Sequence, residues 1–341
     1  MTEAIQEVER TVITQKKGRI YAPGTVSAGP KAARKRKNGV LRHLIQNKVL
    51  LLMLLPGVLF LLINNYLPMF GIVIAFKNIN YIDGILGSPW VGLENFKFLF
   101  ATQDAWIITR NTVLYNLVFI VLNLVAAVAV AIALNELRNK LAAKFYQSVL
   151  FFPYFLSMVV VSYLVFAFLN TEYGFLNKGL LAPLGFSEVD WYSDAGKWPY
   201  ILPLINLWKG VGYSCVIYLA AIIGIDSEYY EAALIDGASK WKQILHITVP
   251  LIRPVIIITT ILAIGGIFRS DFGLFYQTTL NSGPLYPTTL VIDTYVYNAL
   301  INMGNLGMSA AAGLYQAIVG FFLVLGANWI VRKVDRDQAV F

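Results

Sequence analysis

Six apolar runs, each close to the length that crosses a lipid bilayer, divide this sequence of 341 residues. A membrane-spanning helix needs about 20 mostly apolar residues. The runs lie near residues 49–66, 112–134, 148–169, 200–223, 255–272 and 309–331. Within the bilayer, the backbone polar groups of such a run must bond to one another, and an α-helix achieves this within one segment. The predicted fold class is therefore an all-α integral membrane protein with six transmembrane helices over residues 46–335.

Composition supports a membrane class and excludes several kinds of site. The chain is 57% hydrophobic and 13% charged, and its mean hydropathy is +0.63, whereas soluble domains carry about 25% charged residues. The single cysteine, Cys215, excludes a disulfide or a cysteine-based metal site within one chain. With only two histidines, His43 and His246, we expect no bound metal.

The distribution of basic residues predicts the orientation in the membrane. Most of the 27 Lys and Arg residues lie before the first run or just after the second, fourth and sixth runs. Because cytoplasmic segments carry the excess of Lys and Arg, both termini are predicted to be cytoplasmic, with residues 1–45 forming a largely flexible basic tail. The net charge of +8 then reflects topology and attraction to anionic lipid, so we expect a multi-pass protein of the bacterial cytoplasmic membrane and no nucleic-acid partner.

A polar segment, residues 226–254, separates the fourth and fifth runs on the predicted cytoplasmic side. Asp226 and Ser227 are candidate N-caps, Asp236-Gly237 is a predicted turn, and Ser239 is the predicted cap of a second short helix that Pro250 and Pro254 should end. An apolar stripe at helical spacing is formed by Trp241, Ile244, Leu245 and Thr248. Such a stripe favours a partner surface. The alternative is a loop that lies on the membrane interface or packs against its own helices.

The same segment carries a family signature. Glu231-Ala232-Ala233, then Gly237, then Ile247-Thr248-Val249-Pro250 resemble, in order and spacing, the EAA signature of permease subunits in binding-protein-dependent ABC importers. The longer form of that signature also matches at Asp236 and Ala238, and the one departure is Val249, where the family usually has Leu.

Weaker landmarks extend the resemblance over about residues 45–335. They are Gly92-Leu93-Glu94-Asn95-Phe96, Gly174-Phe175-Leu176-Asn177, Gly283-Pro284 and Leu306-Gly307-Met308-Ser309-Ala310-Ala311. The whole is most similar to the group that serves oligosaccharide and polysaccharide-fragment importers, related to the larger permease subunit of the maltose system. This resemblance implies the type I ABC importer permease fold and a carbohydrate cargo.

The resemblance also implies how the chain is driven. The sequence contains no G-x-x-x-x-G-K-[ST] phosphate loop, so ATP and Mg²⁺ are expected on two partner ATPase subunits, and this chain is expected to bind no cofactor and to be no enzyme. In similar proteins the EAA loop docks on such a subunit. The residues expected to couple to the ATPase are Glu231, Ala232, Ala233, Asp236, Gly237, Ala238, Trp241, Leu245 and Pro250. The other implied partners are a second homologous permease, making a heterodimer, and an extracytoplasmic solute-binding protein.

Polar and aromatic residues within or beside the spans are the candidates for the substrate path. Ionisable groups in a bilayer are costly and usually face the protein interior, which singles out Lys209 in the fourth run. The full set is Asn206, Trp208, Lys209, Tyr213, Arg269, Asp271 and Tyr276. Two alternatives stay open: Lys209 as a helix contact, and Arg269 with Asp271 as a pair at the membrane interface. Asn123, Tyr154 and Tyr163 are weaker candidates.

Two rival functions follow from the same residues. An ion-coupled secondary transporter would carry acidic residues within its spans, and here Asp271 and Asp293 lie at or beyond their edges. An ABC importer permease for a non-carbohydrate solute keeps the machinery and changes the cargo.

Overall fold

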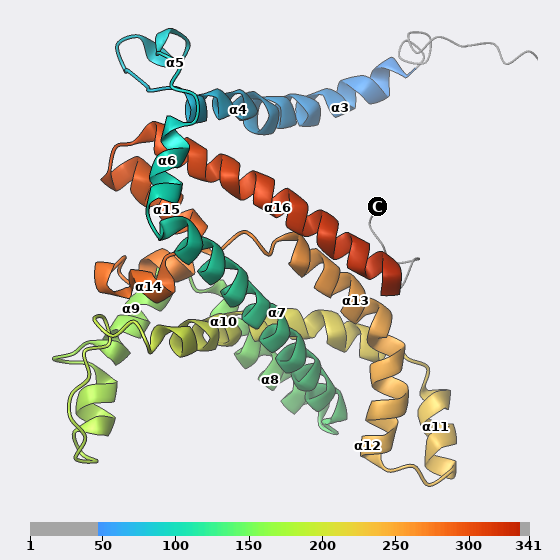
Figure 1. Ribbon diagram of the computed structural model, residues 1–341. Coiled ribbons are helices and arrows are strands. Elements are labelled where there is room, and N and C mark those ends of the chain that lie inside the picture. Colours follow the sequence, from blue (N-terminus) through green and yellow to red (C-terminus); the bar gives the residue numbers. More distant parts are fainter. Residues whose placement is uncertain (1–46, 335–341) are drawn as a thin grey trace, which may run out of the picture. The chain divides into compact units, whose positions relative to one another are not determined.

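The computed structural model describes residues 47–334, and within that range it is helical, apart from one isolated β-bridge between Lys77 and Trp90 (Figure 1). The chain divides into two units, up to Ile63 and from Asn64 onward. The described part of the first unit contains α3 (Lys48–Leu61), which has no buried residue. The predicted basic tail, residues 1–45, lies outside the described residues.

The second unit holds the remaining helices, apart from η1, which begins in the first unit at Leu62 and ends in the second at Tyr66. The long ones are α7 (Asp104–Glu136), α10 (Trp198–Ile223), α13 (Val249–Gly265) and α16 (Leu306–Val334). Shorter α-helices are α4 (Leu67–Met69), α5 (Gly84–Gly87), α6 (Glu94–Ala101), α8 (Lys140–Phe151), α9 (Met158–Leu169), α11 (Ser227–Ile235), α12 (Lys240–Gln243), α14 (Tyr286–Thr289) and α15 (Ile292–Tyr297). The 3-10 and π segments are η1 (Leu62–Tyr66), η2 (Phe70–Phe76), η3 (Phe152–Phe155), η4 (Leu176–Leu181), η5 (Ile244–Thr248), η6 (Gly273–Gln277), η7 (Gly283–Leu285) and η8 (Asn298–Asn302).

Five continuous helical stretches among the described residues are long and apolar enough to cross a membrane. They are Lys48–Phe76, Asp104–Glu136, Trp198–Ile223, Lys240–Gly265 and Leu306–Trp329. A sixth span is formed if Lys140–Phe155 and Met158–Leu169 are taken together, although the two arms meet at 97°. The helical class with up to six spans is the one predicted from the sequence.

The boundaries differ most at the third and fifth spans. The run expected as one helix near 148–169 is broken, because Leu156 and Ser157 are extended and the Ser157 side chain caps α9 by accepting from Val160 N. The fifth helix was expected over residues 255–272. It begins earlier, at Lys240, and also ends earlier, at Gly265. Arg269 and Asp271 therefore lie beyond its end, in the loop before η6.

The buried apolar side chains form three clusters. One joins α7, α9 and α10 with residues 274–291, around Trp198 and Phe275. A second joins α6, α15 and α16 with the start of α7. The third joins the later halves of α7 and α10 to α13, around Cys215 and Ile252. The third cluster matters for function because a cavity with a polar lining lies against it, sharing Tyr218 and Leu124.

Candidate functional site

The polar segment 226–254 folds as α11, a tight turn and α12. Asp226 caps α11 as predicted, since its side chain accepts from Glu228 N at 3.1 Å. At the other end, Ala238 N donates to Ala233 O at 2.9 Å and Gly237 N donates to Leu234 O at 3.0 Å. This pair of bonds is a Schellman motif, which places its glycine in the left-handed region, and Gly237 has φ +73°. The EAA-to-glycine spacing thus specifies how α11 ends.

The helix that follows the turn does not end where the sequence predicted. Pro250 and Pro254 lie inside a helical stretch that continues to Gly265, so the expectation that they end the helix is wrong. Pro250 is tolerated because it falls in the first turn of α13, directly after the π segment η5, where its missing N–H matters least. Ser239 precedes α12 but makes no side-chain cap bond.

The predicted apolar stripe is divided between two faces. Trp241 and Leu245 are exposed, whereas Thr248 is 4% exposed and its hydroxyl bonds Tyr230 Oη at 2.9 Å. The π turn between Leu245 and Thr248 shifts the register that an ideal α-helix would keep. The segment is also fixed from within, because buried Gln243 donates to Ala238 O at 3.2 Å and Lys240 pairs with Glu136 of α7 at 3.0 Å.

Four large apolar side chains are exposed around this turn. They are Leu234, Ile235, Trp241 and Leu245, with Ile235 87% and Trp241 74% exposed. Glu231 is exposed as well. Leu234 and Ile235 were not predicted from the sequence, although two apolar residues next to Asp236-Gly237 were a signal. Exposed apolar side chains grouped on a polar segment mark an interaction surface.

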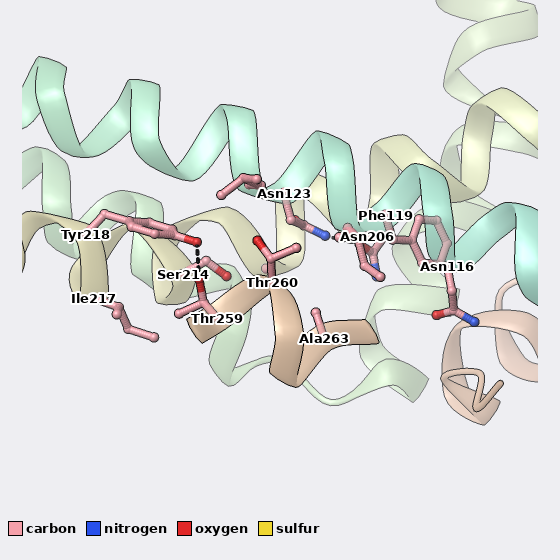
Figure 2. A pocket seen from close by; sticks show the side chains of 13 residues that line it. Asn116, Phe119, Asn123, Asn206, Ser214, Ile217, Tyr218, Thr259, Thr260 and Ala263 are labelled. Carbon is pink, nitrogen blue, oxygen red and sulfur yellow. Dashed lines mark hydrogen bonds between the residues drawn. The ribbon is translucent and has the colours of Figure 1, made fainter. Parts of the chain in front are cut away.

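A second site is a cavity of about 370 Å³ enclosed by α7, α10 and α13. It is lined by Asn116, Phe119, Ile120, Asn123, Leu124, Asn206, Gly210, Ser214, Ile217, Tyr218, Thr259, Thr260 and Ala263. Figure 2 shows two hydrogen bonds across it: Asn123 Nδ2 donates to Asn206 Oδ1 at 2.7 Å, and the hydroxyls of Tyr218 and Thr259 lie 2.8 Å apart. Amides, hydroxyls and apolar groups make up the lining, and none of these residues is charged.

One acceptor in this cavity has no partner within the described residues. Asn123 Oδ1 is buried and unbonded, while the amide nitrogen of the same side chain is used. Burying an unsatisfied polar atom costs free energy, so a donor that reached this atom would gain a hydrogen bond that the described residues do not make. A hydroxyl group on a ligand supplies one.

The predicted path residues of α10 divide between two faces of the helix. Asn206 lines the cavity. Lys209 and Tyr213 instead contact the third span: Lys209 Nζ donates to Tyr154 O at 3.0 Å and Leu156 O at 2.8 Å, and Tyr213 stacks on Tyr154 with ring centroids 4.5 Å apart. Trp208 and Tyr213 are 44% and 46% exposed, so both present aromatic surface outside the cavity.

The predicted residues after α13 are not brought to the cavity. Asp271 Oδ1 accepts from Leu274 N at 3.1 Å, which caps η6. Tyr276 stacks on Phe272 at 4.8 Å and approaches Tyr297 at 4.9 Å. Arg269 is connected to the cavity only through its backbone, because its carbonyl accepts from the cavity residue Asn116 at 3.0 Å.

Several cavity residues were missed from the sequence. These are Asn116, Ser214, Tyr218, Thr259 and Thr260. A signal existed on α10, where Asn206, Gly210, Ser214 and Tyr218 recur every four residues, the spacing of one helical face. On α7 and α13 the faces that line the cavity carry few polar residues, so the sequence periodicity of these helices does not reveal the cavity residues.

Comparisons with known proteins agree over most of the chain. Residues 123–336 match the family described as "Binding-protein-dependent transport system inner membrane component". Two relatives from Bacillus subtilis are the polygalacturonan/rhamnogalacturonan transport system permease protein YteP, 37% identical over 89% of this chain and 94% of the relative, and protein LplB, 35% identical over 86% and 91%.

A solved structure shares the fold. It is a crystal structure of a bacterial ABC transporter involved in the import of the acidic polysaccharide alginate, with a TM-score of 0.78, 30% identity, and coverage of 86% of this chain and 99% of the other. The family match, residues 123–336, contains the α11–α12 turn and the cavity lining from Asn123 onward. The chain therefore belongs to the family of inner-membrane components of binding-protein-dependent transport systems, and it is a permease subunit of an ABC importer, not an enzyme.

Proposed function

We propose that this permease carries an oligosaccharide or polysaccharide fragment into the cytoplasm, and that the cavity between α7, α10 and α13 is part of the path. The observation that carries the proposal is the uncharged lining of amides and hydroxyls with an unpartnered acceptor at Asn123 Oδ1. Sugars present many hydroxyl groups and apolar ring faces. Such a lining matches the hydroxyls, and the exposed rings of Tyr213 and Trp208 offer flat surfaces to the ring faces. The relatives named for polysaccharide transport support the same cargo.

The turn between α11 and α12 is the proposed site of coupling to ATP hydrolysis. Glu231 makes polar contacts with an ATPase subunit, Ala232 and Ala233 allow close approach, and Gly237 with Asp236 and Ala238 shapes the turn. Leu234, Ile235, Trp241 and Leu245 anchor it through apolar contacts. Pro250 lies further along, where the helix enters α13.

The complete importer in this proposal contains more chains. Two ATPase subunits bind ATP and Mg²⁺, a second homologous permease forms a heterodimer with this one, and an extracytoplasmic solute-binding protein delivers the cargo. One of the solved relatives is a bacterial alginate ABC transporter in complex with an alginate pentasaccharide-bound periplasmic protein, which supports a partner of that last kind.

Cargo is tested first with the solute-binding protein. We expect its thermal denaturation midpoint to rise with oligosaccharides and not with amino acids or phosphate, because ligand that binds only the folded state stabilises it. The second measurement is uptake into proteoliposomes that hold the assembled importer. We expect them to take up the same oligosaccharide. Stabilisation by amino acids or phosphate alone would assign a non-carbohydrate cargo.

Coupling is tested with the assembled complex and two variants. Glu231→Gln removes the charge of an exposed side chain, and Gly237→Val forces a β-branched residue into a left-handed conformation. Both should insert in the membrane as the unmodified chain does, and both should lose transport-coupled ATP hydrolysis. Glu228→Gln, a change at another exposed carboxylate of α11, is the matched control. Full coupled activity in both variants would contradict the assignment.

A further inference from the structure

The third span is broken at a point that leaves backbone acceptors without helical partners. η3 ends at Phe155, Leu156 and Ser157 are extended with ψ of 132° and 151°, and α9 begins at Met158. The two arms of the span meet at 97°. A carbonyl left unbonded within a bilayer costs several kcal/mol, so a break of this kind persists only when another part of the protein supplies donors.

Lys209 supplies those donors from α10. Its ammonium group donates to Tyr154 O and to Leu156 O, at 3.0 and 2.8 Å, and it lies 5.7 Å from the centre of the Tyr154 ring. The two acceptors come from either side of Phe155, where η3 ends. An amine within a span is itself costly. The Lys209 ammonium group and the two carbonyls offset each other's cost of burial, because charge-assisted hydrogen bonds are stronger than neutral ones.

The same contact determines where an aromatic pair lies. Tyr154 and Tyr213 stack with centroids 4.5 Å apart and an interplanar angle of 10°, and Tyr213 is one turn from Lys209 on α10. The arm before the break is also held close to α10, since a Cβ on Gly212 would lie 1.9 Å from Leu150 O. The bend, the lysine and the stacked rings therefore form one connected unit.

We propose that Lys209 is a positioning residue that holds the bend of the third span and, through it, the stacked Tyr154–Tyr213 pair as a flat surface for the sugar ring. The link to sugar rests on the proposed function. The link to the bend does not, because it concerns only hydrogen bonds within this chain.

The experiment compares Lys209→Met, which keeps the length of the side chain and removes its donors, with Lys209→Arg, which keeps charge and donors. Spin labels on Val149 of α8 and Tyr163 of α9, both exposed, report the geometry across the break. Cys215 is the single cysteine of this chain, so in a Cys215→Ala background the two introduced cysteines are its only labelling sites, and the chain is labelled before assembly with its partners. Electron–electron distance measurements are made on the assembled importer in lipid.

We expect Lys209→Met to broaden or shift the distance distribution. It should also raise the apparent KM for oligosaccharide about tenfold, because a displaced Tyr154–Tyr213 pair loses its contact with the sugar ring. The maximal rate should change much less, because the α11–α12 turn is untouched. Lys209→Arg should restore both quantities. If Lys209→Met is not recovered in membranes, Lys209→Gln, which keeps N–H donors but cannot reach both carbonyls, is compared with Lys209→Arg and should show the same broadening.

A distance distribution in Lys209→Met that matches the parent protein would overturn the role of Lys209 at the bend. An altered distribution with an unchanged KM would overturn its link to the sugar surface. If the unmodified importer carries no oligosaccharide at all, the proposed function fails, and the distance measurement still decides whether Lys209 holds the bend.

Discussion

Two buried asparagine side chains bond to groups 6 to 20 residues away in the sequence. Asn177, fully buried, donates to Thr171 O and Val189 O and accepts from Val189 N and Trp191 Nε1, at 2.9–3.2 Å. Asn95 donates to Ala75 O at 3.0 Å and Lys77 O at 2.9 Å. Each satisfies backbone groups that would otherwise be buried unbonded. This explains why both sequence landmarks, Gly92–Phe96 and Gly174–Asn177, contain an asparagine.

Gly307 belongs to a third sequence landmark, Leu306–Ala311, and it lies next to Asn95 of the landmark Gly92–Phe96. A Cβ at Gly307 would lie 2.5–2.6 Å from the side-chain atoms of Asn95. Gly307→Ala should therefore displace Asn95, break its two bonds and destabilise the protein by about 2 kcal/mol. Thermal denaturation of the purified protein measures the change.

A double-mutant cycle isolates the cause. In an Asn95→Ala background the clash is absent, so adding Gly307→Ala should cost much less than it does in the parent, which gives a strong coupling energy. Gly283→Ala, at a glycine with no atom near its Cβ position, should change little. Additive effects of Asn95→Ala and Gly307→Ala would mean that their contact contributes nothing.

At the scale of elements, the apolar runs predicted the number of membrane spans better than the residues at which each span begins and ends. Pro153 and Ser157 lie inside the third run, and proline with an N-cap residue are signals for a helix end and a helix start. The apolar run concealed them, because a length criterion weighs hydropathy alone. The early start of the fifth helix depends on Gln243, Tyr230 and Glu136, whose partners lie 5 to 104 residues away in the sequence, and local patterning does not reveal such contacts.

Close packing between α8 and α10 depends on Gly212. Because a Cβ there would lie 1.9 Å from Leu150 O and 2.7 Å from Phe151 N, Gly212→Ala forces backbone atoms apart. We expect a loss of about 3 kcal/mol or more, seen as a lower denaturation midpoint. Gly313→Ala, inside α16 with nothing near its Cβ position, is the matched control. It should be neutral or stabilise by about 0.5–1 kcal/mol, and an equal loss in both variants would contradict the packing argument.

The loop before α10 should loosen in acid. Hydrogen bonds from the Ser193 side chain lower the pKa of Asp190 below its usual 3.8, and the hydrogen bond from Lys197 does the same for Asp194. A carboxylate whose pKa is lower in the folded state stabilises that state above its unfolded pKa, and the contribution is lost as pH falls through the folded pKa. The protection of residues 187–197 against hydrogen exchange, taken relative to the intrinsic rate at each pH, should therefore fall as the pH drops below about 4.

The matched variant for that loop is Asp190→Asn with Asp194→Asn. It should exchange faster at neutral pH and lose the acid dependence, because neither position then titrates. If the protection of this loop against exchange, relative to the intrinsic rate, stays constant in the parent protein down to the lowest pH, these carboxylates do not hold the loop.

For the whole molecule, the two proposed sites differ in how far the sequence alone predicts them. The coupling turn is contiguous, so its capping residue, its glycine and its alanines stand at fixed spacing within one segment. The cavity is assembled from α7, α10 and α13, which contribute residues from 116 to 263. Three helical faces have to be brought together before the polar lining exists, and single-helix periodicity reveals only the α10 face. For Lys209 the sequence left open both a place in the path and a helix contact, and its ammonium group bonds to a helix break within the third apolar run.

Asn123 is the residue at which the cavity's chemistry is tested most directly. Its Nδ2 atom bonds Asn206 and its buried Oδ1 atom has no partner among the described residues, so a sugar hydroxyl that donates to Oδ1 would gain a hydrogen bond otherwise unmade. Asn123→Leu, similar in size but without polar atoms, should raise the apparent KM for oligosaccharide uptake about tenfold while assembly and basal ATP hydrolysis persist. Val125→Leu, at an exposed position of the same helix, is the control and should transport normally. An Asn123→Leu importer with unchanged KM and unchanged cargo range would remove this cavity from the substrate path, whatever the cargo proves to be.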